Sequence, residues 1–188
     1  MPVVLETERL LLRRPEPEDV DVLAQALADP DVMRYIGDGR TRGHEEAVRW
    51  VETDQRRWTL DGFGKFAVVR RTDGRLIGRV GLSAWDPETW THSSRAEIGP
   101  HAEIELGWTL LRDAWGAGYA TEAAQAVRDW ALDELALARL ISLIHPDNAR
   151  SQRVARRLGE THERDIVTAR GHPAQLWALN SGSRAASD

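Results

Sequence analysis

The chain of 188 residues contains no cysteine. Without thiols there is no disulfide framework, no thiolate zinc site and no cysteine nucleophile. A transferred group therefore cannot be carried on a cysteine, and we expect it to pass directly from donor to acceptor. We predict an activity that uses no metal.

Long apolar runs and a basic surplus are missing as well. No apolar stretch approaches the ~20 residues of a membrane span, and residues 1–6 lack the basic region and apolar core of a secretion signal. The net charge of -5 argues against general nucleic-acid binding, which needs a surplus of basic side chains on one face. We expect a cytoplasmic protein with no membrane and no nucleic acid as partner.

Lysine is almost absent, since Lys65 is the only one while arginine occurs throughout. We interpret this imbalance as a coding bias rather than a functional choice. The eight tryptophans are many for this length and are by default packing residues.

Apolar periodicity and turn residues predict a single domain over residues 1–180, followed by a disordered polar tail over 181–188. Strands are expected over 7–14, 64–71, 75–85, 104–111, 140–144, 161–167 and 175–179. Helices are expected around the apolar stripes at 20–27, 47–58, 123–131 and 148–158. The segment 86–101 carries two prolines and a glycine and is predicted to be a loop. The resulting order is β-αα-βββ-α-β-α-ββ.

Two glycines flank Ala117 at the junction between the central strand and the following helix. Gly116 and Gly118 permit a tight turn that gathers backbone N–H groups at a helix start, a geometry that suits a phosphate. A helix start without any ligand can carry the same two glycines, so the turn alone leaves both interpretations open.

Three motifs in a fixed order resemble the GNAT acetyltransferase superfamily, and within it the RimJ/RimL-type protein N-terminal acetyltransferases. Glu105-Leu106-Gly107-Trp108 is similar to the family's fourth strand, residues 115–123 to its pyrophosphate turn, and Asn148-x-x-Ser151 to a later motif. The resemblance covers residues 5–179. It implies an α/β (α+β) GNAT fold, with a mixed, mostly antiparallel sheet of about seven strands, helices on both faces, and splayed fourth and fifth strands.

The resemblance implies acetyl-coenzyme A (acetyl-CoA) as cosubstrate, with its pantetheine arm between the splayed strands. Gly107 would spare the thioester a crowding side chain, and an N–H near Trp108 would polarise the acetyl carbonyl. Asp113 stands where the superfamily's turn usually has Gln or Arg, which matters little if backbone amides bind the phosphates. The implied cofactor-binding residues are Gly107, Trp108, Thr109, Leu110, Ala114, Trp115, Gly116, Ala117, Gly118, Tyr119, Ala120, Thr121, Asn148 and Ser151.

Two carboxylates, Glu103 and Glu105, share one face of the central strand because side chains alternate along a strand. The family pattern selects Glu105 as the catalytic base, whereas the alternative is a solvated strand face. A glutamate of ordinary pKa is a weak base, so Glu105 should act through a water or have its pKa raised by burial and by Glu103.

Ser151 is the second catalytic residue that the resemblance implies. In the RimJ/RimL-type branch this serine faces the coenzyme sulfur and is proposed to protonate the departing thiolate. The chain's two tyrosines, Tyr35 and Tyr119, lie outside this helix. Asn148 either caps the helix by accepting the N–H of residue 150 or 151 or, as the resemblance implies, forms a hydrogen bond with the pantetheine arm or with the surroundings of the acceptor.

Other residues near the fifth strand receive structural interpretations. We read His145 as a strand-end packing residue rather than a base. We favour a solvated helix face over a phosphate site for Arg150, Arg153, Arg156 and Arg157. Gly159-Glu160 stands where the family commonly has Gly-Phe, so local packing there should differ.

The sequence thus predicts an N-acetyltransferase that moves an acetyl group from acetyl-CoA to a primary amine, with a protein N-terminal α-amine as favoured acceptor. The alternatives are a small amine, such as an amino acid, polyamine or aminoglycoside, or a non-catalytic sensor that binds acyl-CoA. The resemblance also allows a homodimer.

Overall fold

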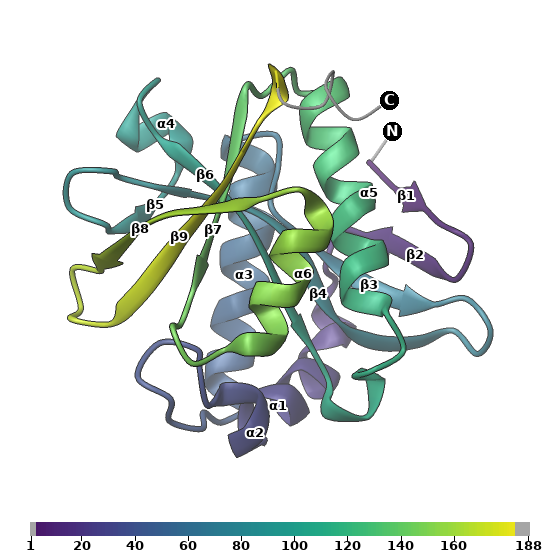
Figure 1. Cartoon of the computed structure of the whole chain (residues 1–188). Coiled ribbons are helices and arrows are strands. Elements are labelled where there is room, and N and C mark those ends of the chain that lie inside the picture. The colour runs from purple at the N-terminus through teal and green to yellow at the C-terminus, as the bar shows by residue number, and fades with distance from the viewer. Residues whose placement is uncertain (1–2, 183–188) are drawn as a thin grey trace.

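The computed structural model describes residues 3–182, in which one sheet of nine strands runs through the molecule (Figure 1). The strands follow the spatial order β1-β2-β3-β4-β6-β7-β9-β8, and β5 pairs with β4. All neighbours are antiparallel except β6 and β7. The bounds are β1 Leu5–Glu6, β2 Leu10–Arg13, β3 Lys65–Arg70, β4 Arg75–Trp85, β5 His92–Ser93, β6 Glu103–Leu110, β7 Arg139–Ile144, β8 Thr161–Val167 and β9 Pro173–Asn180.

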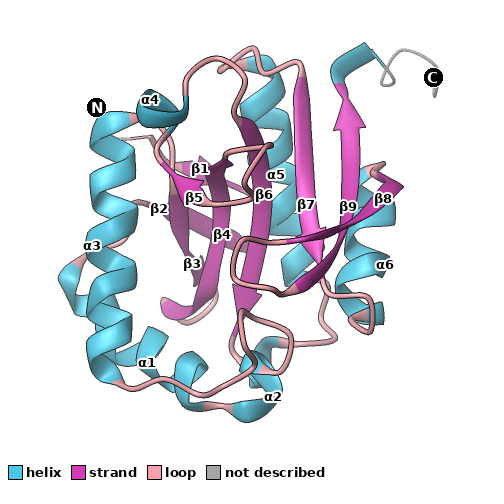
Figure 2. Cartoon of the chain, turned by 90° about the vertical axis from the view of Figure 1, so that its left-hand side faces the viewer, coloured by secondary structure: helices cyan, strands magenta, loops and turns pink. Residues whose placement is uncertain are grey.

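Helices cover both faces of the sheet (Figure 2). On one face lie α1 (Val20–Ala28) and α3 (His44–Leu60), and on the other α5 (Tyr119–Asp133) and α6 (Ala149–Leu158). The short α2 (Pro30–Met33) lies beyond the ends of the strands, next to α1 (Figure 2). The larger apolar core lies between the sheet and α5, and a smaller one lies under α1 and α3. The predicted α/β architecture, a mixed and mostly antiparallel sheet with helices on both faces, is confirmed, with nine strands in place of about seven.

Local details differ from the prediction in three places. The first expected strand, over 7–14, is shortened to β2, because residues 7–9 form a turn in which the Thr7 hydroxyl accepts the Leu10 N–H at 3.0 Å. The additional strand β1 precedes this turn and folds back on β2. Pro30 begins the short α2 rather than only ending α1, with Asp29 as its N-cap. The expected loop over 86–101 contains β5 and α4 (Arg95–Ile98), whose N-cap Ser94 forms a capping box with Glu97.

The parallel strands β6 and β7 are the feature that positions the site. Their only paired residues in the described chain are Glu105 and Ile141, near the start of both strands. Beyond that point the backbones part, as predicted for the splayed fourth and fifth strands. A strand edge with free backbone groups is thereby presented next to Gly107 and Trp108.

Two further findings concern residues 3–182 only. No helix among them has both the length and the apolar character needed to cross a membrane, and no cluster of His, Asp or Glu side chains there is arranged to hold a metal ion. The predicted tail falls largely on residues 183–188, which lie outside the described residues. Ser181 itself is bonded to the domain, since its N–H donates to Ala138 O at 2.8 Å.

Candidate active site

The turn between β6 and α5 adopts the conformation that its glycines suggest. Gly116 and Gly118 have φ angles of 81° and 85°, in the left-handed region that favours glycine. Gly118 is the N-cap of α5 and offers no side-chain cap. The N–H groups of residues 116–121 find no backbone acceptor within residues 3–182. These donors are available to a phosphate, and the helix dipole favours negative charge there.

Arg9 holds this turn against the sheet, a role that sequence reasoning missed. Its Nη1 donates to Ala117 O at 2.9 Å, and its guanidinium lies 4.7 Å from the centroid of the Tyr119 ring. Glu122, in the first turn of α5, accepts from Thr7 Oγ1 at 2.6 Å and from Arg9 N at 3.0 Å. The available signal was the acidic residue four positions after Gly118, which needed a partner from elsewhere in the chain.

The negative charge of Asp113, close to the glycine turn, is balanced by an arginine. Its carboxylate pairs with Arg75 at 2.7 Å, at the exposed end of β4. The departure from the family's usual Gln or Arg is therefore neutralised by a neighbouring strand.

A cleft of about 250 Å³ lies between α2, the end of β6, the glycine turn and α6. Every predicted cofactor-binding residue lines it except Gly107 and Ala117. Arg150, Arg153 and Arg157 line it as well, and the Arg150 guanidinium lies 4.0 Å from the Trp115 ring centroid. These arginines are exposed as predicted, yet they also face the cleft. Arg156 instead lies over Trp177.

Asn148 lies at the start of α6, where its side-chain oxygen forms a capping hydrogen bond. Asn148 Oδ1 accepts the Ser151 N–H at 3.1 Å, so Asn148 caps α6. The Ser151 hydroxyl accepts from Trp108 Nε1 at 3.3 Å, which links α6 to β6 across the opening. His145 Nδ1 accepts the Asp147 N–H at 3.1 Å and its ring packs on Tyr35, in keeping with the packing interpretation.

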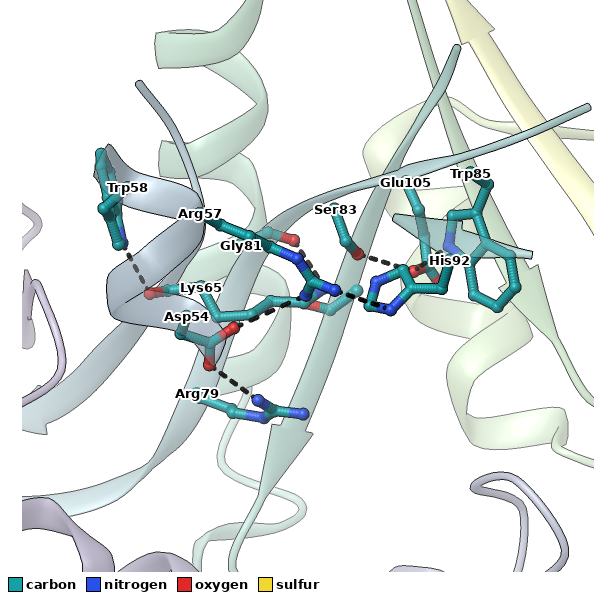
Figure 3. Close-up of polar contacts among 11 residues, drawn as sticks. Asp54, Arg57, Trp58, Lys65, Arg79, Gly81, Ser83, Trp85, His92 and Glu105 are labelled. Carbon is teal, nitrogen blue, oxygen red and sulfur yellow. Dashed lines mark hydrogen bonds and ion pairs between the residues drawn. The ribbon is translucent and has the colours of Figure 1, made fainter. Parts of the chain in front are cut away.

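Glu105 and Glu103 share a strand face but have different partners. Glu105 Oε2 accepts from Ser83 Oγ at 3.0 Å and from Trp85 Nε1 at 2.9 Å, both on β4 (Figure 3). Glu103 is paired at 3.1 Å with Arg139, which also pairs with Glu163 at 2.7 Å. Glu105 is thus oriented by two neutral donors that both contact Oε2 and leave Oε1 to other groups.

Lys65, the only lysine of the chain, lies beside Glu105. Lys65, Gly81 and Gly107 are register partners across β3, β4 and β6. The lysine Nζ donates to Gly81 O at 2.9 Å and to Gly107 O at 3.5 Å (Figure 3). A Cβ added at Gly107 would lie 2.7 Å from this Nζ and 3.5 Å from Glu105 Oε1. Gly107 therefore makes room for the lysine, a reason the sequence analysis did not contain.

Burial lowers the pKa of the Lys65 ammonium to about 8, against the opposing attraction of Glu105. Further charged side chains lie between Lys65 and α3. Asp54 accepts from Arg79 at 2.7 Å, and Arg57 Nη2 lies 2.7 Å from His92 Nδ1 (Figure 3). Burial and the positive charge of Arg57 lower the pKa of His92, so the neutral imidazole accepts this bond.

Comparison with known proteins agrees with the geometry. Residues 9–161 match the family model described as Acetyltransferase (GNAT) domain. The uncharacterized N-acetyltransferase p20 of Bacillus licheniformis is 31% identical over 180 residues, 94% of each chain.

Solved structures show the same arrangement. An acetyltransferase from Agrobacterium tumefaciens has a TM-score of 0.77 at 28% identity, with 96% of each chain covered. RimL, titled a ribosomal L7/L12 alpha-N-protein acetyltransferase in complex with coenzyme A, has a TM-score of 0.74 at 16% identity, covering 95% of this chain and 98% of that one. The family match over most of the chain, carried on this fold, shows that the protein belongs to the GNAT acetyltransferases and is an acetyl-CoA-dependent acetyltransferase.

Proposed function

We propose that this enzyme acetylates a protein N-terminal α-amine, as the RimJ/RimL-type branch does. The observation that carries the proposal is the Glu105 carboxylate, fixed by Ser83 and Trp85 on the strand that borders the opening between β6 and β7. A positioned carboxylate beside a cleft with unpaired N–H donors is what direct transfer to an amine requires.

The residues of the cleft fit acetyl-CoA. The unpaired N–H groups of the glycine turn suit the diphosphate, and Arg150, Arg153 and Arg157 supply the positive charge that further phosphate oxygens need. The free edge of β6 provides backbone partners for the pantetheine arm. Acetyl-CoA, when bound, supplies the activated acetyl thioester.

Glu105 is the proposed base. Since Oε2 is occupied by two donors, Oε1 is the atom that takes a proton, directly or through a water. An α-amine of pKa near 7.8 needs about 1 kcal/mol to lose its proton at pH 7, whereas a lysine near 10.4 needs about 4.6 kcal/mol. A carboxylate base therefore favours an N-terminal amine as acceptor.

Ser151 is the proposed acid, held toward β6 by its hydrogen bond with Trp108. We expect Ser151→Ala to lower kcat about ten- to a hundredfold while leaving the affinity for coenzyme A within about twofold, because only the departing thiolate loses a proton donor. Steady-state kinetics and calorimetric titration of coenzyme A measure the two effects. Equal loss of affinity and rate would assign Ser151 to binding instead.

RimL, an alpha-N-protein acetyltransferase of ribosomal L7/L12, shares the fold at 16% identity, which supports testing this acceptor class first. The test for the present chain is a panel of acceptors incubated with acetyl-CoA and analysed by mass spectrometry. Peptides with free N-termini are compared with the same peptides blocked at the N-terminus but carrying lysine, and with amino acids, polyamines and aminoglycosides.

Acetylation confined to free N-termini is the expected result. If only small amines are acetylated, the acceptor is a small amine and not a protein N-terminus, and acetyl transfer from acetyl-CoA remains the reaction. No product with any amine, from folded protein that binds coenzyme A, would point to the non-catalytic sensor.

A further inference from the structure

Glu160 is a buried acid that the proposed reaction does not use. It lies at the connection from α6 to β8 and exposes 4% of its surface. Gly159, with φ of 87°, ends α6, and the Glu160 N–H donates back to Ala155 O at 3.0 Å. This is the helix-ending motif whose second residue past the end is usually apolar and packs inward. The motif therefore turns the Glu160 side chain into the protein interior.

Ser142 connects the Glu160 carboxyl group to β6 at the point where β6 and β7 separate. Ser142 Oγ lies 2.9 Å from Glu160 Oε1 and 2.7 Å from Leu106 O. Ser142 follows Ile141, and Leu106 follows Glu105, the two residues of the last β6–β7 pair. The serine is thus the first link across the two strands after their backbone pairing ends.

The single hydroxyl hydrogen of Ser142 bears on the protonation state of Glu160. A hydroxyl has one hydrogen, and the Leu106 carbonyl and an ionised Glu160 can both only accept it. The Leu106 contact is the shorter of the two, 2.7 Å against 2.9 Å, so we assign the Ser142 hydrogen to it. A carboxylate at Glu160 would then face the Ser142 oxygen with no hydrogen between them. No ion pair with Glu160 occurs among residues 3–182, and its Oε2 is buried without a partner.

We propose that Glu160 is a positioning residue for acetyl transfer: as a neutral carboxylic acid it donates to Ser142, which donates to Leu106 O and holds β6 at the point where the strands part. Leu106 lies between Glu105 and Gly107, so this link fixes the segment that carries the proposed base. Burial raises the pKa of the Glu160 carboxyl to about 8. The charges that face it are Glu105 on β6, which raises this pKa, and Arg128 on α5, which lowers it.

The inference rests on the proposed function only for its catalytic consequence. The first measurement is therefore independent of turnover. The Glu160 carboxyl carbon, assigned in carbon-13 NMR by its absence from Glu160→Gln, is titrated with pH. A midpoint near 8 is expected, and a midpoint near the ordinary value of about 4.3 would overturn the proposal.

The second measurement compares wild type with Glu160→Gln, whose amide keeps a donor for Ser142 at every pH. Coenzyme A affinity and kcat/KM are each expressed as the value for wild type divided by the value for Glu160→Gln. Both ratios should be constant from pH 6 to 7 and fall above pH 8. For kcat/KM the fall should approach about tenfold per pH unit. Ser142→Ala should remove this difference between Glu and Gln. Exposed Glu134→Gln is the matched control and should follow wild type.

A flat ratio from pH 6 to 9.5 would overturn the positioning role. The coenzyme A titration needs no acceptor amine, so it distinguishes this outcome from failure of the proposed function. If no amine is acetylated yet the affinity ratio falls above pH 8, Glu160 still holds the strand opening and the acceptor proposal alone fails. Glu160→Leu, which has no donor, should weaken coenzyme A binding already at pH 7.

Discussion

Lys65 shows how the meaning of one residue depends on its neighbours. As the only lysine among many arginines it looked like an accident of coding, yet it is the amine that spans Gly81 and Gly107 beside Glu105. A guanidinium is a larger, planar group with a different donor geometry and does not replace a compact ammonium there. The rarity of lysine was itself the signal, because arginine is used elsewhere.

We expect Lys65→Arg to be the more damaging of two substitutions at this position. Overpacking against Gly107 should destabilise the protein by about 1–3 kcal/mol and lower kcat at least about tenfold. Lys65→Met keeps the stem without the charge and should be less destabilising. Urea unfolding and steady-state kinetics measure both, and a Lys65→Arg variant indistinguishable from wild type would contradict the packing reason.

Glu105 and Glu103 form a matched pair for testing the base. Glu105→Gln should lower kcat by about 10²–10⁴ and leave coenzyme A affinity unchanged, because the lost group acts on the acceptor proton. Glu103→Gln changes the same residue type on the same strand face, where the carboxylate belongs to an ion-pair network with Arg139 and Glu163. It should keep kcat within about threefold. Equal effects of the two changes would remove Glu105 from its proposed role.

At the scale of elements, Gly116 and Gly81 are required for different physical reasons. Gly116 has positive φ, but a Cβ there would meet no atom within 4 Å, so its constraint is the backbone conformation alone. A Cβ at Gly81 would lie 2.3 Å from Gly64 O and 2.6 Å from Lys65 Cα, both backbone atoms of the β3 side. One glycine shapes a turn, and the other permits two strands to pack.

Gly116→Ala should therefore cost about 1–2 kcal/mol of unfolding free energy and weaken coenzyme A binding by distorting the turn. Gly81→Ala should cost about 3 kcal/mol, because the backbone of β3 must move. Urea unfolding and calorimetric titration of coenzyme A measure these effects. A Gly81→Ala variant more stable than Gly116→Ala would contradict the close approach of the two strands.

For the whole molecule, Glu160 links folding to pH. Its carboxyl pKa is raised from 4.5 to about 8 on folding, so the folded state holds the proton more tightly than the unfolded chain. The stabilisation is complete below pH 4.5 and is lost as pH rises toward 8. Lys65 acts in a different window, since lowering its pKa from 10.5 to about 8 makes stability increase between these values.

Wild type minus Glu160→Gln isolates the first effect. The difference in unfolding free energy should be constant below pH 4.5, fall between pH 4.5 and 8 with a slope approaching about 1.4 kcal/mol per pH unit, and be constant above. Urea denaturation at each pH provides the measurement. A difference that does not vary between pH 5 and 8 would mean that Glu160 titrates as it does in the unfolded chain.

The sequence by itself determined the order of the main elements and the glycine turn, because periodicity and turn chemistry are local properties. Its resemblance to a family, carried by short motifs, selected Glu105, Asn148 and Ser151 as site residues. Tertiary structure alone decided the shortening of the expected strand over 7–14 to β2, the roles of Arg9 and Lys65, and the burial of Glu160. Arg9 meets Ala117, and Lys65 meets Gly107, only when strands distant in the chain are brought together. The protonation of Glu160 follows from the same cause, since its pKa depends on what surrounds it and not on what adjoins it in sequence.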